Sequence, residues 1–192
     1  MKQIVIASNN KGKIQEIKEI LKGYEIISLK EANCDIEVEE NQETFEGNSL
    51  KKAKEISEKL NMPCIADDSG LCIESLEGWP GVNTARFLGQ NKTDRQRNEA
   101  ILEKMVNLKE NQRNATVVCV MTYYNNEQII VAKGEIKGKI ASECRGENGF
   151  GFDEIFELEN GKTLAELTSE EKNKISSRKI ALENLRKQLT NM

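Results

Sequence analysis

Patterns typical of strands and helices alternate along this chain, and that alternation restricts the folds it can adopt. Lys2–Ala7 is an apolar run with the length of a buried strand, and Lys11–Lys22 has the apolar spacing of an amphipathic helix. Tyr24–Leu29 repeats the strand pattern and Phe45–Leu60 repeats the helical one, which Pro63 ends. Such an alternation is typical of α/β proteins.

The second half of the chain adds a hairpin. Ala115–Tyr124 and Gln128–Ala132 are predicted strands joined by a short polar turn. The other predicted elements are a strand from Cys64 that ends in Asp67–Gly70 and continues at Leu71–Ile73, a helix over Thr93–Leu108, a strand over Glu154–Leu158 and a helix over Ser177–Leu189. We expect an α/β fold with a mixed β-sheet flanked by helices, in which residues 1–192 form a single domain of two lobes enclosing a central cleft.

The absence of histidine from the sequence restricts the chemistry. Hydrolases that use a serine or cysteine nucleophile with an imidazole base are excluded, and so are histidine-ligated zinc sites. Any metal must be held by carboxylates. Oxygen ligands favour a hard cation, Mg²⁺ or in its place Mn²⁺.

Charge and hydropathy bear on partners and location. The 28 basic and 32 acidic residues are spread along the chain, without the basic stripe that would bind a nucleic acid backbone. The sequence contains no run of about 18 apolar residues, so no membrane span is predicted. The N-terminal apolar run is too short for a signal peptide. Five cysteines without a C-x-x-C motif indicate reduced thiols. We therefore expect a cytoplasmic protein that binds neither nucleic acid nor membrane.

A polar turn between the first strand and the first helix has the composition of a phosphate-binding site. Backbone N–H groups, the helix N-terminus and two lysines can converge on anionic oxygens there. The alternative is a capped turn with solvated lysines. The residues are Ser8, Asn9, Asn10, Lys11, Gly12 and Lys13.

Two adjacent aspartates, Asp67 and Asp68, are predicted at a strand end. Side chains alternate between the faces of a strand, so we expect one of the two to face the cleft, and we select Asp68. Its carboxylate could hold Mg²⁺ or take a proton from water. The alternative is that Asp67–Gly70 is an ordinary turn.

Three further segments carry candidate groups. The acidic residues Asp35, Glu37, Glu39 and Glu40 could complete a metal site, although such runs are more often solvated. Gly149–Asp153 offers aromatic rings for stacking a base and glycines for close backbone contact. Lys172, Ser177 and Arg178 could donate to a base carbonyl or to phosphate, or could be surface residues.

Taken in order, these segments make the chain resemble the inosine/xanthosine triphosphate pyrophosphatase family, also called dITP/XTP pyrophosphatases. The resemblance covers nearly the whole chain. The motifs that carry it are Ser8–Lys13, Thr44-Phe45 with Asn48 and Lys52-Ala53, Ala66–Leu71, Pro80–Val82 with Ala85-Arg86, Gly149–Asp153, and Ser176–Arg178 with Ala181-Leu182.

The resemblance implies a homodimer of two-lobed α/β subunits that binds a nucleoside triphosphate in the central cleft, with Mg²⁺ bridging its oxygens. It assigns phosphate binding to Ser8–Lys13, proton acceptance and metal ligation to Asp68, and a substrate contact to Ser69. Glu40 is the candidate second metal ligand, with Asp35 and Glu39 as alternatives. The nucleotide pocket would be lined by Phe150, Gly151, Phe152, Asp153, Lys172, Ser177 and Arg178.

The implied reaction is hydrolysis of noncanonical purine nucleoside triphosphates (ITP, dITP, XTP) to the monophosphate and pyrophosphate. Three residues depart from the family pattern: Ser177 stands where histidine is usual, and Phe152 and Asn83 stand where tyrosine is common. These departures bear on base selectivity. Two alternatives therefore remain, a pyrophosphatase for another modified or pyrimidine nucleotide and a nucleotide-binding sensor without turnover.

Overall fold

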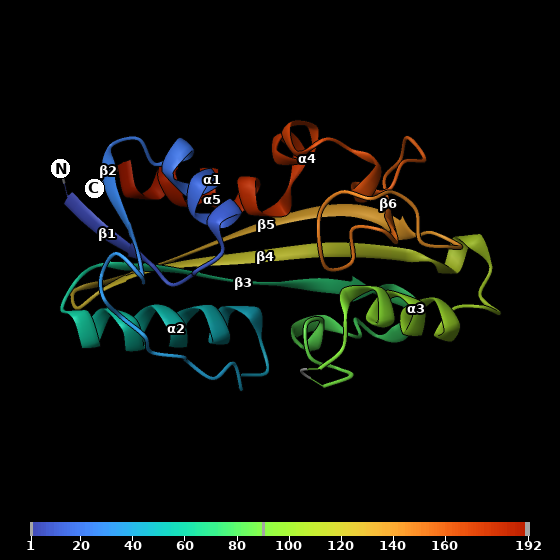
Figure 1. Ribbon diagram of the computed structural model, residues 1–192, viewed down its shortest axis with the longest axis horizontal. Coiled ribbons are helices and arrows are strands. Elements are labelled where there is room, and N and C mark those ends of the chain that lie inside the picture. The colour runs from blue at the N-terminus through green and yellow to red at the C-terminus, as the bar shows by residue number, and fades with distance from the viewer. Residues whose placement is uncertain (1, 90, 191–192) are drawn as a thin grey trace. The chain divides into compact units, whose positions relative to one another are not determined.

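The computed structural model describes residues 2–89 and 91–190, except for the side chain of Lys11 (Figure 1). The strands are β1 (Lys2–Ile6), β2 (Tyr24–Ser28), β3 (Cys64–Ile73), β4 (Asn114–Asn125), β5 (Gln128–Ile140) and β6 (Phe156–Glu157). The helices are α1 (Lys11–Ile20), α2 (Phe45–Leu60), α3 (Asp94–Lys104), α4 (Ser169–Ile175) and α5 (Ser177–Thr190), with short 3-10 helices at Glu74–Leu76, Gly81–Asn83, Glu110–Gln112 and Leu164–Glu166.

The strands of the described residues form one sheet in the order β2-β1-β3-β4-β5-β6. β1 is parallel to both β2 and β3, whereas β6 is antiparallel to β5. The α/β fold with a mixed sheet and flanking helices is therefore confirmed. None of the helices in residues 2–89 and 91–190 is long and apolar enough to cross a bilayer.

Two features of the sheet and one helix differ from the prediction. The prediction that Asp67 and Asp68 lie at a strand end is wrong: they are the fourth and fifth residues of a ten-residue strand, because fully buried Leu71 and Ile73 continue β3 beyond Gly70. β5 runs past Ala132 to Ile140, through glycines that weaken the strand pattern. Helix α4 was not predicted.

The chain divides into two compact units. Unit 1 comprises Met1–Asp68, Cys119–Gly134 and Ser177–Met192, and unit 2 comprises Ser69–Val118 and Glu135–Ser176. The core of unit 2 contains Ile101 of α3 and Met105, the residue that follows α3, together with Ile73 and Phe156. That residues 1–192 act as a single functional domain remains a prediction.

In unit 1, alternate residues of β1 serve two cores. Ile4 and Ile6 pack in one cluster with residues of α1 and α5, whereas Val5 packs in the other with Ile56 of α2. Figure 1 shows α1 and α5 over one face of these strands and α2 over the other. The connection β1-α1-β2 therefore runs over one face of these strands and the connection β2-α2-β3 over the other. The strands β2 and β3 lie on either side of β1. The carboxyl end of β1 is a topological switch point, the place where α/β sheets bind ligands.

Close packing of α5 on β5 within unit 1 depends on Gly134. A Cβ atom there would lie 2.1 Å from the carbonyl oxygen of Ser177 and 2.4 Å from the backbone nitrogen of Ala181. We expect Gly134→Ala to lower the free energy of unfolding by about 1–3 kcal/mol, because backbone atoms cannot yield as a side chain would. Urea denaturation measures the effect. Gly23→Ala is the control, since nothing lies within 4 Å of its added methyl; an equal loss in both variants would contradict the expectation.

Candidate active site

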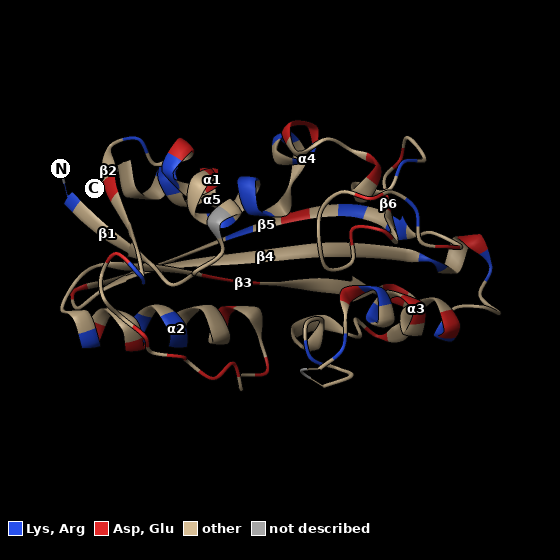
Figure 2. Cartoon of the chain, viewed as in Figure 1, with Lys and Arg blue, Asp and Glu red and all other residues tan. Residues whose placement is uncertain are grey.

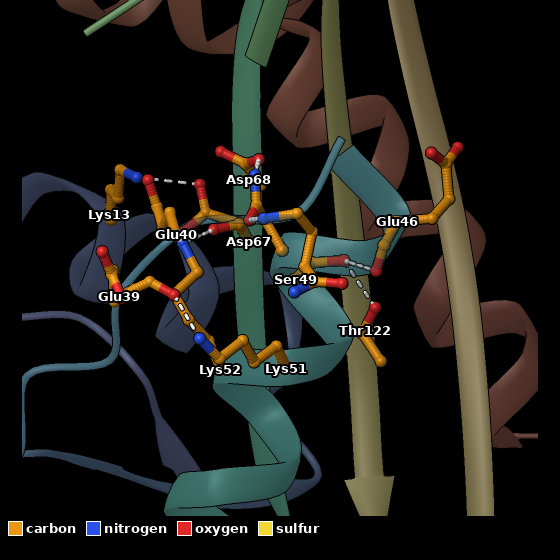
Figure 3. A network of polar contacts seen from close by, with 12 residues as sticks. Lys13, Glu39, Glu40, Glu46, Ser49, Lys51, Lys52, Asp67, Asp68 and Thr122 are labelled. Carbon is orange, nitrogen blue, oxygen red and sulfur yellow. Dashed lines mark hydrogen bonds and ion pairs between the residues drawn. The ribbon is translucent and has the colours of Figure 1, made fainter. Parts of the chain in front are cut away.

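Asp67 lies in β3 and is 5% exposed, with its side chain directed to the face of α1 and α5. Its Oδ2 lies 2.8 Å from Nζ of Lys13 at the start of α1 and 3.4 Å from Nη2 of Arg178 at the start of α5. Figure 3 shows the contact with Lys13. β3 thus brings together two cations that lie far apart in the sequence.

The charges around Asp67 determine its protonation. Burial alone would raise its pKa, but the positive charges of Lys13, Arg178 and Lys52 outweigh burial and hold the pKa of this carboxyl well below its usual range. Asp67 is therefore an anion at neutral pH. Asp67 neutralises and fixes two cations. The sequence patterns favoured Asp68 and did not predict this role of Asp67.

Asp68 points to the opposite face of β3, as strand alternation predicts. It is 6% exposed, and its Oδ2 accepts a hydrogen bond of 2.9 Å from Nδ2 of Asn48 on α2. The Oδ1 of fully buried Asn48 accepts in turn from the backbone N–H of Gln42 at 2.9 Å. One amide therefore connects Asp68 to the end of the acidic segment 35–42 and restricts the orientation of its carboxylate.

The acidic segment is connected to β3 at Glu40. The carboxylate of Glu40 pairs with Nζ of Lys52, which also donates to the backbone oxygen of Asp67 at 2.6 Å (Figure 3). Glu39 instead uses its backbone oxygen, which accepts from Lys51 at 2.8 Å. The side chains of Asp35, Glu37 and Glu39 are exposed. Of these acidic side chains, Glu40 is the one held beside Asp67 through a shared lysine.

The turn between β1 and α1 lies in the same unit as Asp68. Asn10 caps α1, with Oδ1 accepting from the backbone N–H of Gly12 at 2.9 Å and of Lys13 at 3.2 Å, and Ser8 Oγ accepts from Asn10 N–H at 3.1 Å. The turn therefore has the geometry of a capped helix start, while the partly exposed side chain of Lys13 pairs with Asp67. Asn9 is exposed. The side chain of Lys11 lies outside what the structure describes.

Arg178 and Ser177 begin α5 in the same unit, and neither is a surface residue. Ser177 is 6% exposed. The guanidinium of Arg178 lies between two carboxylates, Asp67 and, at 3.8 Å from Nη1, Glu16 of α1. Its Nε is buried without a hydrogen-bond partner among the described residues. Burial lowers the pKa of Arg178, but the charges of Asp67 and its neighbours outweigh it and raise the pKa, so the guanidinium stays charged.

Unit 2 brings together the aromatic segment 149–153 and Lys172. Asp153 is 3% exposed, pairs with Nζ of Lys172 and accepts from the backbone N–H of Phe150 at 2.7 Å. The Lys172 Nζ lies 4.4 Å from the centroid of the Phe150 ring. Phe150 is 53% exposed, whereas Phe152 packs against the core of unit 2. Ser69, also in unit 2, is partly buried on β3.

Basic and acidic side chains are mixed along the described part of the chain. Figure 2 shows lysines and arginines interspersed with acidic residues along the elements, as on α2. Across the described ranges, no group of three or more Cys, Asp or Glu side chains is arranged to hold a metal ion by itself. A cation bound here would therefore need additional ligands.

Comparison with known proteins agrees with the sequence motifs. The model of the Ham1 family matches residues 4–188. The chain is 45% identical to the dITP/XTP pyrophosphatase of Clostridium perfringens and 44% identical to that of Bacillus subtilis, covering 98% of both proteins in each case.

Solved structures show the same relationship. The Ham1 protein of Staphylococcus aureus has a TM-score of 0.92 at 42% identity over 99% of both chains. The nucleoside-triphosphatase / dITP/XTP pyrophosphatase of Mycobacterium abscessus has a TM-score of 0.81 at 37% identity, covering 95% of this chain and 98% of that one. The family resemblance seen in the sequence is thus confirmed, and the chain belongs to the Ham1 family.

Proposed function

We propose that this chain hydrolyses ITP, dITP and XTP to the nucleoside monophosphate and pyrophosphate, and so removes noncanonical purines from the nucleotide pool. The observation that carries the proposal is the pair of adjacent buried carboxylates on β3, near the carboxyl end of β1, with Lys13 and Arg178 beside the first of them. The curated relatives named dITP/XTP pyrophosphatase support the same activity.

Lys13 and Arg178 would bind the triphosphate. Asp67 holds both cations before any substrate arrives, so little reorganisation is needed when phosphate charge moves during the reaction. Lys11 and the polar groups of the turn would add donors to the phosphate oxygens. These groups are Ser8, Asn9, Asn10 and Gly12, whose N–H also donates to Oδ1 of Asn10.

Asp68 would act as the general base. Its carboxylate accepts the proton of a water molecule that attacks the α-phosphorus, and the bond to the bridging oxygen breaks to release pyrophosphate. Asn48 keeps this carboxylate oriented through its 2.9 Å hydrogen bond. The sequence contains no histidine to take this role, so the base must come from another residue type.

The donor set fits Mg²⁺, with Mn²⁺ as a substitute. Mg²⁺ is usually held by one or two carboxylates together with substrate phosphates and water. Asp68 and Glu40 would be its ligands. When bound, the ion would neutralise phosphate charge and lower the pKa of bound water. Glu40 is kept near β3 by Lys52, which pairs with Oε1 of its carboxylate.

Phe150, Gly151, Phe152, Asp153, Lys172 and Ser177 would bind the nucleoside, with Ser69 in contact with the substrate. Donors at a purine 6-oxygen would be left unpaired by the amino group of adenine, and such a mismatch can discriminate by about 10⁴-fold or more.

We further propose that the protein is cytoplasmic, acts as a homodimer of single-domain subunits and binds no nucleic acid.

Release of pyrophosphate from a panel of nucleotides tests the proposal. With Mg²⁺ present, we expect turnover of ITP, dITP and XTP to exceed that of ATP by at least about 100-fold. GTP, which shares the purine 6-oxygen, and UTP complete the panel. Chelation should abolish turnover, and Mn²⁺ should restore part of it. Detection of orthophosphate instead of pyrophosphate would contradict the proposed site of attack.

Two other results would favour the alternatives. Preferred turnover of a pyrimidine or another modified nucleotide would show that Ser177, Phe152 and Asn83 have changed the base that the site accepts. Tight binding of ITP without hydrolysis would identify a sensor. Both lysines of the turn and the Asp67–Asp68 pair favour the enzyme.

A further inference from the structure

The backbone of Gly151 in unit 2 is held on both sides by helix α3. Its N–H donates to Oδ2 of Asp94 at 2.7 Å, and its carbonyl oxygen accepts from Nδ2 of Asn98 at 2.9 Å. Asp94 and Asn98 are four residues apart, and therefore lie on one face of α3. The bond to Asp94 involves a charged acceptor, which makes it stronger than a bond between neutral groups.

Both α3 residues are themselves fixed. Thr93 caps α3 in a capping box with Gln96, which sets the first helical turn where Asp94 lies. Asn98 is 2% exposed, and its Nδ2 also lies 3.2 Å from Oε2 of Glu154. Both side chains that contact Gly151 therefore project from a capped helix.

These contacts fix the backbone beside Phe150. Asp153 accepts from the N–H of Phe150, and Gly151 has a φ of +65°, a left-handed conformation that glycine tolerates and other residues rarely adopt. Phe150 is nonetheless 53% exposed, with Lys172 Nζ near its ring. Large aromatic side chains are normally buried, so a rigid backbone that presents one to solvent suits a surface for stacking.

We infer that Asp94 and Asn98 are positioning residues for base recognition, which hold the Phe150–Gly151 segment in the conformation that stacks a purine. This inference rests on the proposed function in one respect, the role of Phe150 as a base contact. Neither α3 side chain touches the nucleotide. Their effect is to order the segment before binding, so that the ligand need not supply the free energy for ordering it.

Equilibrium binding of inosine monophosphate, which has a base, and inorganic triphosphate, which has none, tests this inference without any turnover. We expect Asp94→Ala and Asn98→Ala to raise the Kd for inosine monophosphate about tenfold and to change that for triphosphate less than about twofold. If ITP is hydrolysed, KM should rise with kcat nearly unchanged. Asp94→Asn should restore binding, because its amide oxygen can still accept from the N–H of Gly151.

Glu99→Ala is the matched control, since its carboxylate is exposed on α3 and pairs with Arg95 rather than with the loop. Asp94 has an exposed side chain, so its variants should fold even if Asn98→Ala does not. Three results would overturn the inference: equal affinity for inosine monophosphate in all proteins, a parallel loss of affinity for both ligands, or no binding of inosine monophosphate by the wild type. Failure of the wild type to hydrolyse any nucleotide would instead overturn only the proposed function.

Discussion

Asp68→Asn should lower kcat/KM for ITP by about 10³-fold or more, because the variant loses both its general base and a carboxylate metal ligand. The amide oxygen of asparagine can still accept the hydrogen bond that Asn48 donates to Asp68, so the surroundings should be kept. We expect most of the loss in kcat. Steady-state measurement of pyrophosphate release, with circular dichroism to confirm folding, gives the answer.

The control for this experiment is Glu58→Gln, which removes a carboxylate from the exposed surface of α2 in the same unit. It should retain the wild-type rate. The rate of Asp68→Asn should also recover in part as pH rises, since hydroxide replaces a missing base. Retention of more than about a tenth of the wild-type kcat at neutral pH would remove Asp68 from the role of base.

Local signals in the sequence predicted the elements that they determine directly. The range Phe45–Leu60 was predicted for α2 and is observed, because Thr44 caps one end and Asn61 adopts a left-handed conformation at the other, just before Pro63. The capping box at Thr93 likewise marks the start of α3. In both cases the residues that end a helix are its own neighbours in the sequence.

The site depends on contacts that no local signal contains. Asp67 meets Lys13 from 54 residues away and Arg178 from 111 residues away. Strand alternation correctly separates Asp67 from Asp68, but it cannot show which face carries buried cations. The hydrogen bond from the N–H of Gly151 to Asp94 was not predicted for the same reason. The one signal for it was that a loop rich in left-handed glycines needs partners for its backbone groups.

Asp67→Ala should destabilise the protein by about 3 kcal/mol, because it removes the carboxylate partner of Lys13 and leaves Arg178 with Glu16 alone in a largely buried setting. For a chain of this size, such a loss corresponds to a decrease in Tm of roughly 10 °C. Asp67→Asn should have a smaller effect, since its amide oxygen still accepts from Lys13. The exposed-pair control Glu58→Gln should change the free energy of unfolding by less than about 1 kcal/mol.

The dependence of stability on pH separates the charge of Asp67 from its packing. Its pKa in the folded protein is held below the unfolded value of about 3.9. Above that unfolded value both states are ionised and the stabilisation is fully present; as pH falls towards the folded pKa, the unfolded state binds the proton first and the stabilisation is lost. In urea titrations, the difference in free energy of unfolding between wild type and Asp67→Asn should therefore stay constant from pH 5 to 8, values well above about 3.9. The difference should decrease below pH 4. If the difference in free energy of unfolding is unchanged at pH 2, packing rather than charge makes Asp67 stabilising.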